Sequence, residues 1–122
     1  KWLTIEEPFD ITSAIKNAPS SACIIIDCLT LWVSNLMMRE TSEQEISSAC
    51  TKSLSAISQH NGKTIVISNE VGLGVVPETA LGREYREILG RVNQQWARAA
   101  RQSLFLIAGK AFPLHDPQEI LQ

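Results

Sequence analysis

Two carboxylates stand at the ends of strand-like runs and are the residues of this sequence best placed to do chemistry. Asp27 closes the run of residues 22–27, and Glu70 closes the run of residues 64–70. Both runs are rich in β-branched apolar residues without polar alternation, which is typical of strands buried on both faces of a parallel sheet. Because parallel strands present their carboxyl ends to one crevice, the two acids are expected to share a ligand site.

Carboxylates in this position commonly serve nucleotide binding. In P-loop enzymes an acid at the end of a buried strand holds Mg²⁺, directly or through water, while a glycine-rich loop surrounds the phosphates. No such loop precedes Asp27 in this sequence. Strand chemistry alone therefore indicates an α/β ligand-binding domain and leaves simpler roles open. Asp27 could cap the next helix, and Glu70 could accept hydrogen bonds from loop amides.

Two glycine-containing segments imitate phosphate-binding motifs but lack key positions. Residues 62–64, Gly-Lys-Thr, end like a phosphate loop, yet Ile57 stands where a glycine is required and the segment leads into a strand. Residues 72–77 imitate a dinucleotide fingerprint, yet Pro77 occupies the third glycine position. Neither segment is interpreted as a phosphate site, and the second is interpreted as a turn.

The histidines and cysteines offer no metal site. His60 and His115 have no acidic or cysteine partner at ligand spacing, so a helix C-terminus and a tail are their preferred interpretations. The three cysteines are an odd number without a C-x-x-C pair, which argues against a disulfide framework and a zinc site. Cys23 and Cys50 fall on apolar faces and are interpreted as small core residues.

Composition fits one α/β domain, residues 1–122. With 44% hydrophobic and 20% charged residues, the chain is long enough for a core, although small for a complete doubly wound nucleotide enzyme. The formal net charge of −2 disfavours nucleic acid as the main partner. No apolar stretch approaches the roughly 18 residues that span a bilayer, and no leader opens the chain. A cytoplasmic protein without a membrane span is expected.

The expected elements alternate as in βαβ units. Strands are predicted at residues 22–27, 64–69 and 104–108, and residues 1–8 have the pattern of a further strand. Helices are predicted at about residues 10–17, at 29–38, from Ser42 to a break at 60–62, and at about 79–101. Residues 110–122 are mixed in character and are expected to fray. The inner face of the last helix is expected to contain Leu81, Tyr85, Ile88, Leu89, Val92, Trp96 and Ala100.

Three segments together resemble one enzyme family. They are residues 27–36 (DCLTLWVSNL), 68–78 (SNEVGLGVVPE) and 90–94 (GRVNQ). In this order and spacing they resemble the bifunctional adenosylcobinamide kinase/adenosylcobinamide-phosphate guanylyltransferase of cobalamin biosynthesis, over residues 1 to about 109. The resemblance implies a P-loop NTPase-like (RecA-like) α/β fold with a mostly parallel sheet and helices on both faces, incomplete at the N-terminus.

The activity that the resemblance implies uses nucleotides. Such enzymes phosphorylate the aminopropanol hydroxyl of adenosylcobinamide with ATP or GTP. They then transfer GMP from GTP to that phosphate through a guanylylated histidine, which releases pyrophosphate and yields adenosylcobinamide-GDP. The implied cofactors are GTP, ATP and Mg²⁺, and the implied assembly is a homotrimer.

Few functional residues of that family match positions in this chain. Glu6 matches a GTP-contacting glutamate, with Glu7 as the alternative register. Asp27 matches the acid that ends the Walker-B-like strand, a GTP or Mg²⁺ contact. The residues kept as site or structural residues because they lie in family motifs are Asn69, Glu70, Arg91 and Asn93.

The resemblance also implies parts that this chain lacks. The phosphate loop and the guanylylated histidine would lie before Lys1, and neither His60 nor His115 matches that histidine. The missing strand would be central in the sheet, so a partner or the rest of the protein must cover the apolar edges beside it. Residues 31–38, with Trp32, are expected to form a contact surface.

Two other classes stay open at this point. One is a different RecA-like P-loop ATPase, which an upstream sequence with a phosphate loop but no suitably placed histidine would indicate. The other is a non-catalytic α/β interaction module whose acidic strand ends are only caps. Calorimetry with GTP and adenosylcobinamide on the extended protein distinguishes the module, which is expected to bind neither.

Residues 1–122 alone are expected to be inactive. Phosphoryl transfer depends on positioning and charge stabilisation by the phosphate-loop backbone, its lysine and Mg²⁺, and the first two are missing here. Incubation with radiolabelled GTP is expected to give no covalent guanylyl adduct. A stable labelled adduct on this chain would contradict the expectation.

Overall fold

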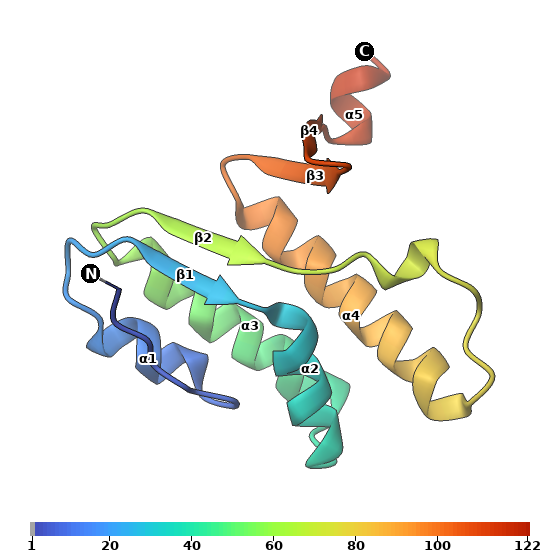
Figure 1. Ribbon diagram of the computed structural model, residues 1–122, viewed down its shortest axis with the longest axis horizontal. Helices are drawn as coiled ribbons and strands as arrows, with labels where there is room; N and C mark the ends of the chain where they lie inside the picture. The colour runs from blue at the N-terminus through green and yellow to red at the C-terminus, as the bar shows by residue number, and fades with distance from the viewer. Residues whose placement is uncertain (1) are drawn as a thin grey trace.

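The computed structural model describes residues 2–122, which form helices and strands in alternation (Figure 1). In chain order the elements are α1 Ile11–Asn17, β1 Ile24–Asp27, α2 Leu29–Met38, α3 Glu43–Ser58, β2 Thr64–Ile67, the 3₁₀ turn η1 Val71–Leu73, α4 Ala80–Ala99, β3 Ser103–Ile107, β4 Lys110–Leu114 and α5 Pro117–Ile120. The mixed α/β class is confirmed. Residues 2–8, expected as a strand, have no regular secondary structure, and Lys1 lies outside the described residues.

Strands β1 and β2 form a parallel pair, as predicted. Their register runs from Ile24 opposite Thr64 to Asp27 opposite Ile67. Both strands therefore end at the same edge, and the chain leaves that edge toward α2 from β1 and toward η1 from β2 (Figure 1).

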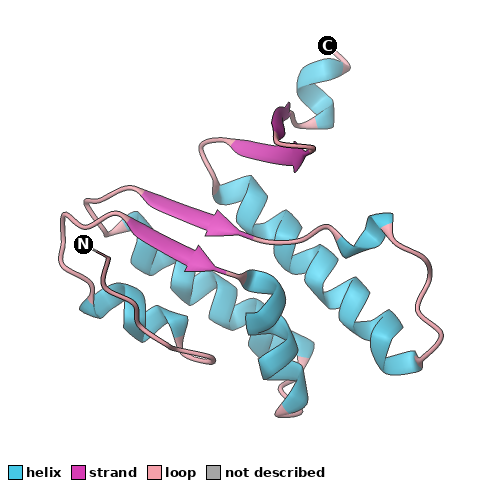
Figure 2. Ribbon diagram, in the orientation of Figure 1, coloured by secondary structure: helices cyan, strands magenta, loops and turns pink. Residues whose placement is uncertain are grey.

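Helices cover one face of this pair, whereas helices on both faces were expected. Ile26 and Val66 point toward the helical layer and pack against the core cluster. On the opposite face Ile25, Ile65 and Ile67 are 42%, 44% and 41% exposed. Figure 2 shows α1 and α3 on the same side of the two strands. The apolar residues on both sides of each strand explain the expectation, but residues 2–122 supply only one covering layer.

The core lies between the helices. Helix α3 packs against α1 and α4, and α4 also packs against α2. Cys50 is fully buried, as predicted, whereas Cys23 is exposed because it lies on the uncovered side of β1. The buried core residues are Ile11, Ile15, Leu29, Trp32, Val33, Leu36, Ile46, Cys50, Ala56, Ile88, Leu89, Val92 and Trp96.

Two expected apolar surfaces are narrower than predicted. Leu81 and Ala100, at the two ends of the expected inner face of α4, are exposed. Trp32 was expected on a contact surface but is only 3% exposed, because the apolar circumference of α2 is mostly enclosed by the core. Leu31 and Met38 remain exposed on that helix, at 64% and 76%.

Local sequence signals explain where the helices begin. The Asp10 side chain accepts a hydrogen bond from the Ser13 amide at the start of α1. Ser42 and Glu45 form the predicted capping box of α3, in which each side chain bonds the backbone amide of the other residue. Gly62 is required by close approach rather than by a phosphate, because a Cβ there would lie 1.9 Å from the Ala22 carbonyl oxygen.

The C-terminal region differs from the expectation. The third predicted strand exists as β3, but it pairs antiparallel with β4 as a hairpin and not with the parallel pair. Residues 110–122, expected to fray, form β4 and the short helix α5, which Asp116 caps. A tight turn at residues 108–109, with positive φ at both, reverses the chain and allows the hairpin. The apolar pattern of the strand alone did not indicate this turn.

Substitution of Leu89 tests the position of the core. Leu89 is fully buried in the middle of α4, so Leu89→Ala is expected to lower the free energy of unfolding by about 2–5 kcal/mol. Leu81→Ala, on the same helix but 57% exposed, is the matched control and is expected to change it by no more than about 0.5 kcal/mol. Urea denaturation measures both values, and equal losses would contradict this assignment of the core.

Candidate functional site

Asp27 lies exposed at the carboxyl end of β1 and is not used to hold the fold together. The residue that caps α2 is Cys28, and it makes no side-chain capping bond. Among residues 2–122 no hydrogen bond or ion pair involves the Asp27 carboxylate. The simpler role of a helix cap is therefore not realised, and both carboxylate oxygens are available to a ligand.

Asn69 lies two residues beyond the end of β2 and is bonded to Thr30 in the first turn of α2. The Asn69 amide donates to Thr30 Oγ1 at 3.0 Å, and Thr30 Oγ1 donates to Asn69 Oδ1 at 2.9 Å. This reciprocal pair joins the two chain segments that leave the parallel strands. Thr30 comes only three residues after Asp27, so the pair lies next to the exposed carboxylate in sequence.

Asn93 of α4 holds the same segment from the other side. Its Nδ2 donates to the Asn69 carbonyl oxygen at 3.0 Å, and its Oδ1 accepts from Ser68 Oγ at 2.6 Å. The asparagine of the third family-like segment, residues 90–94, thus contacts the second one, residues 68–78. The structure brings Asn69 and Asn93 together, as a shared site or structural role requires.

Tyr85 adds a bond between α4 and the start of α2. Its hydroxyl donates to the Thr30 carbonyl oxygen at 3.1 Å. Burial raises the pKa of the Tyr85 phenol, and the neighbouring Cys28 adds to the effect, so the hydroxyl keeps its proton at neutral pH and remains a donor. Helix α4 therefore reaches the strand ends through two residues, Tyr85 and Asn93.

Glu70 adopts the simpler of its two predicted roles. Its Oε1 accepts a hydrogen bond from the Gly72 amide at 3.0 Å, which caps the 3₁₀ turn η1. The glycines of residues 72–77 accordingly belong to a turn, as the sequence indicated. Glu70 follows β2 at the sheet edge where Asp27 ends β1, but one of its side-chain oxygens accepts the bond from the Gly72 amide.

Arg91 lies in a helix contact. Its guanidinium binds the Glu43 carboxylate through both Nε and Nη2, and its Nη2 lies 3.7 Å from Glu87 Oε2. Glu43 opens α3, so the pair joins α3 to α4. Arg91 therefore has a different role from Asn93, two positions later: Arg91 joins two helices, whereas Asn93 contacts the strand ends.

The structure distinguishes Glu6 from Glu7. Glu7 Oε1 accepts from the amides of Phe9 and Asp10, both at 2.9 Å, and these bonds lower the pKa of Glu7. Glu6 is exposed, and no hydrogen bond or ion pair involves its side chain within residues 2–122. Glu7 therefore shapes the turn into α1, while Glu6 has a carboxylate available to a ligand.

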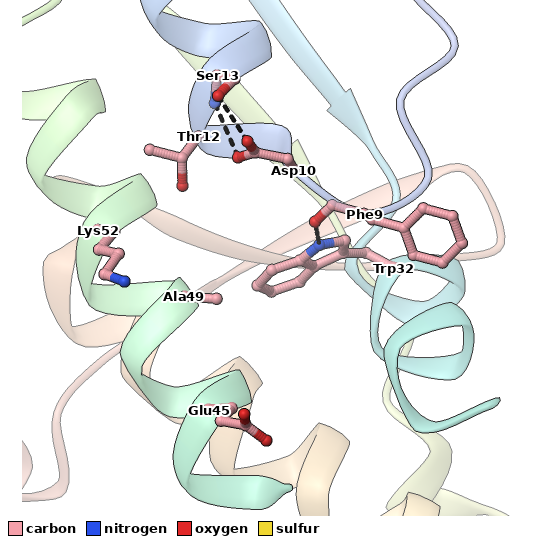
Figure 3. Close-up of a pocket in the computed structure, with 8 residues that line it drawn as sticks. All are labelled: Phe9, Asp10, Thr12, Ser13, Trp32, Glu45, Ala49 and Lys52. Carbon is pink, nitrogen blue, oxygen red and sulfur yellow. Dashed lines mark hydrogen bonds between the residues drawn. The ribbon is translucent and has the colours of Figure 1, made fainter. Parts of the chain in front are cut away.

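A cavity of about 430 Å³ lies elsewhere, between α1, α3 and Trp32 (Figure 3). Its polar lining serves the local fold: Asp10 binds Ser13, and Trp32 Nε1 donates to the Phe9 carbonyl oxygen at 2.8 Å. Glu45 belongs to the capping box of α3. None of the residues predicted for a nucleotide lines this cavity, so the strand ends remain the better candidate site.

The described part of the chain contains no preformed metal cluster and no helix that could cross a membrane. No group of three or more His, Cys, Asp or Glu side chains in residues 2–122 is arranged to hold a metal. His60 Nε2 lies 2.8 Å from the Ala22 carbonyl oxygen, and His115 Nδ1 lies 3.4 Å from Glu119 Oε2. Both histidines have the local roles that the sequence indicated. None of the helices in the same residues is long and apolar enough to span a bilayer.

Sequence reasoning missed three members of the hydrogen-bonded group at the strand ends. Thr30, Ser68 and Tyr85 all contact its asparagines or one another, yet none was predicted as a site residue. Thr30 and Ser68 do lie inside the family-like segments, so a closer look at polar residues in those segments could have found them. Tyr85 gave no such signal, because its spacing predicted only a core position.

The parallel pair and its helical layer define a mixed α/β domain, with the Asp27 carboxylate exposed at the carboxyl edge of the sheet. The chain belongs to the cobinamide kinase / cobinamide phosphate guanyltransferase family (CobU), whose sequence model matches residues 1–114. The resemblance drawn from the three segments is confirmed, and the match extends through β4.

Curated relatives agree with this family. The bifunctional adenosylcobalamin biosynthesis protein CobP of Pseudomonas aeruginosa is 34% identical over 114 residues, which cover 93% of this chain and 65% of that protein. The bifunctional adenosylcobalamin biosynthesis proteins CobU of Escherichia coli K12 and Salmonella typhimurium LT2 are 30% and 33% identical, and each match covers 88% of this chain and 67% of the relative. The chain thus spans about two thirds of the length of these relatives.

A double-mutant cycle tests the structural role of Arg91. The pair with Glu43 is half exposed, so Arg91→Ala and Glu43→Ala are expected to show a coupling of about 0.2–1 kcal/mol in urea denaturation. Because the pair is screened by salt, the coupling is expected to fall in 1 M NaCl. The matched control is Arg86→Ala on the same helix, for which no ion pair is present in residues 2–122. Absence of coupling at low salt would contradict the structural role.

Proposed function

We propose that this chain forms the acidic part of the nucleotide site of an adenosylcobinamide kinase and adenosylcobinamide-phosphate guanylyltransferase. The observation on which the proposal rests is the Asp27 carboxylate, exposed at the carboxyl edge of the parallel pair with no partner in residues 2–122. Ligands of open parallel sheets bind at the carboxyl ends of the strands, so ligand binding would explain a charged group at that edge.

The donor set at this edge fits Mg²⁺ bound together with a nucleotide. Mg²⁺ in phosphate-transfer sites typically keeps several waters and takes only one or two protein carboxylates, the remaining ligands being phosphate oxygens. A single unpaired carboxylate, with no further acid required, satisfies that pattern. Asp27 would hold the ion, directly or through water, and the bound ion would neutralise charge on the phosphates of GTP or ATP.

Glu6 is the second proposed nucleotide contact. Its carboxylate is exposed and unbonded within the described residues, whereas Glu7 is occupied by backbone amides. An ionised carboxylate can only accept hydrogen bonds, so Glu6 would recognise donors of the nucleotide, such as hydroxyl or amino groups, rather than its phosphates.

The sheet supports a larger P-loop NTPase-like fold. Within residues 2–122 β2 pairs only with β1, and β3 pairs only with β4, so each has an open edge. A two-stranded sheet with one apolar face uncovered is marginally stable alone.

A phosphate loop and a histidine nucleophile, both required for the two reactions, would come from the remaining third of the protein, as would the central strand of the sheet. An assembly into a trimer would cover further apolar surface, including Leu31 and Met38 of α2.

The proposed reactions divide between this chain and that remainder. The chain binds and orients the nucleotide and its Mg²⁺, while the phosphate loop and histidine perform the phosphoryl and guanylyl transfers. The two competing classes have weaker support. A non-catalytic module gives no role to an unpaired strand-end carboxylate, and a different RecA-like ATPase is not the family that matches residues 1–114.

Asp27→Asn in the full-length natural protein tests the proposal. It is expected to weaken GTP binding in the presence of Mg²⁺ by about tenfold or more, since a contact to a charged group contributes about 1.5–3 kcal/mol. The loss is expected to disappear when Mg²⁺ is removed, because the carboxylate acts through the ion. Isothermal titration calorimetry with GTP measures both affinities.

Asp116→Asn in the α5 cap is the matched control and is expected to leave GTP affinity unchanged. Equal affinity for wild type and Asp27→Asn, with and without Mg²⁺, would refute the assignment of Asp27. In the same titrations Glu6→Gln is expected to weaken GTP binding with or without Mg²⁺. Glu7→Gln is expected instead to lower the melting temperature, because two backbone amides lose a charged acceptor.

A further inference from the structure

The parallel ladder of β1 and β2 includes Asp27 but ends before Ser68 and Asn69. Its last pair is Asp27 with Ile67, and neither Ser68 nor Asn69 is paired with β1. Beyond that point the two segments diverge, β1 into α2 and β2 into η1. Backbone ladder bonds therefore position Asp27 but not Ser68 and Asn69.

Side chains replace the ladder at this edge. Thr30 Oγ1 accepts from the Asn69 amide and donates to Asn69 Oδ1, so one hydroxyl joins the two departing segments. Asn93 binds the Asn69 carbonyl oxygen and the Ser68 hydroxyl. Asn69 consequently has its amide, its carbonyl and its side-chain oxygen all bonded, although the residue itself is exposed.

These three bonds of an exposed residue add only modestly to stability. Exposed hydrogen bonds compete with water, and each contributes only about 0.5–1.5 kcal/mol net. The same bonds are well suited to preorganisation, because a binding site needs its contacts held within a fraction of an ångström by neighbouring side chains. Thr30 is also anchored from behind by Tyr85, whose hydroxyl donates to the Thr30 carbonyl oxygen.

We propose that Thr30 and Asn93 are positioning residues of the nucleotide site: they fix the segment after β2 against the segment after β1 and so set the position of Asp27 relative to Asn69. This inference rests on the proposed function of Asp27. The Asn69 side-chain oxygen Oδ1 accepts a bond from Thr30. Its side-chain nitrogen Nδ2 has no partner in residues 2–122, so Nδ2 is the donor that Asn69 offers to a ligand oxygen such as a phosphate.

Thr30→Val removes the hydroxyl while keeping the shape of the side chain. In the full-length natural protein it is expected to lower kcat for GMP transfer by about tenfold or more with KM for GTP changed less than threefold, since small misplacements at a site reduce the rate strongly. Thr30→Ser retains the hydroxyl and is expected to restore kcat to within about threefold of wild type. Asn93→Asp, which keeps the acceptor for Ser68 but loses the donor to Asn69, is expected to behave like Thr30→Val.

Thr51→Val is a closely matched control. The Thr51 hydroxyl also donates once, to the Ser47 carbonyl oxygen, and accepts once, from Gln95 Nε2, but it lies on α3 away from the strand ends. It is expected to leave kcat unchanged. Amide hydrogen exchange adds a readout that does not depend on activity: Thr30→Val is expected to speed exchange at Asn69 and at residues 71–74, and Thr51→Val is not.

The outcomes separate this inference from the proposed function. If Asp27→Asn abolishes activity while Thr30→Val and Asn93→Asp keep kcat within twofold, the positioning role is wrong and the function of Asp27 stands. If Asp27→Asn is fully active, the proposed site itself is wrong. A Thr30→Val enzyme that loses activity without rescue by serine would also overturn the positioning role, because the hydroxyl would then not be the group that matters.

Discussion

The parallel pairing of β1 with β2 is the constraint on which the remaining structure depends. Since parallel strands run the same way, the segments that follow both strands leave the sheet at one edge. The chain must then return along helices that pack on a face of the sheet. In this molecule α3 makes that return between β1 and β2, and Ile26 and Val66 bind the sheet to the helical core. The same geometry brings the first turn of α2 beside the segment after β2, where Thr30 contacts Asn69.

Local signals allowed much of the fold to be predicted. The capping box of Ser42 and Glu45 predicted the start of α3, and the apolar runs predicted β1 and β2 to within two residues. The pairing of β3 was harder to predict, because an apolar run indicates a buried strand but not which segment pairs with it. The residues after β3 therefore gave no indication that β4 would fold back on it. The sequence also did not predict that one face of the parallel pair would be uncovered in residues 2–122. Hydrophobicity indicates that a surface needs covering but not which segment covers it.

The acidic residues of the candidate site could be predicted from the sequence, but the hydrogen bonds between the neighbouring polar side chains could not. Asp27 and Glu70 looked equivalent in sequence. The structure distinguishes them, because Glu70 binds the Gly72 amide while the Asp27 carboxylate has no hydrogen-bond partner within residues 2–122. Motif resemblance likewise grouped Arg91 with Asn93, although one joins two helices and the other reaches the strand ends. A sequence motif records that residues occur together; it does not separate those that face a ligand from those that hold a helix in place.

The uncovered face of the parallel pair has a kinetic meaning as well as a structural one. Ile25, Ile65 and Ile67 are exposed side by side, and β1 is a short β-branched strand without proline. Open strand edges and apolar faces of this kind pair readily with copies of themselves. As the protein is synthesised, productive folding therefore competes with self-association for the same strands. Early covering of this face therefore favours folding over association, a benefit separate from the final stability of the fold.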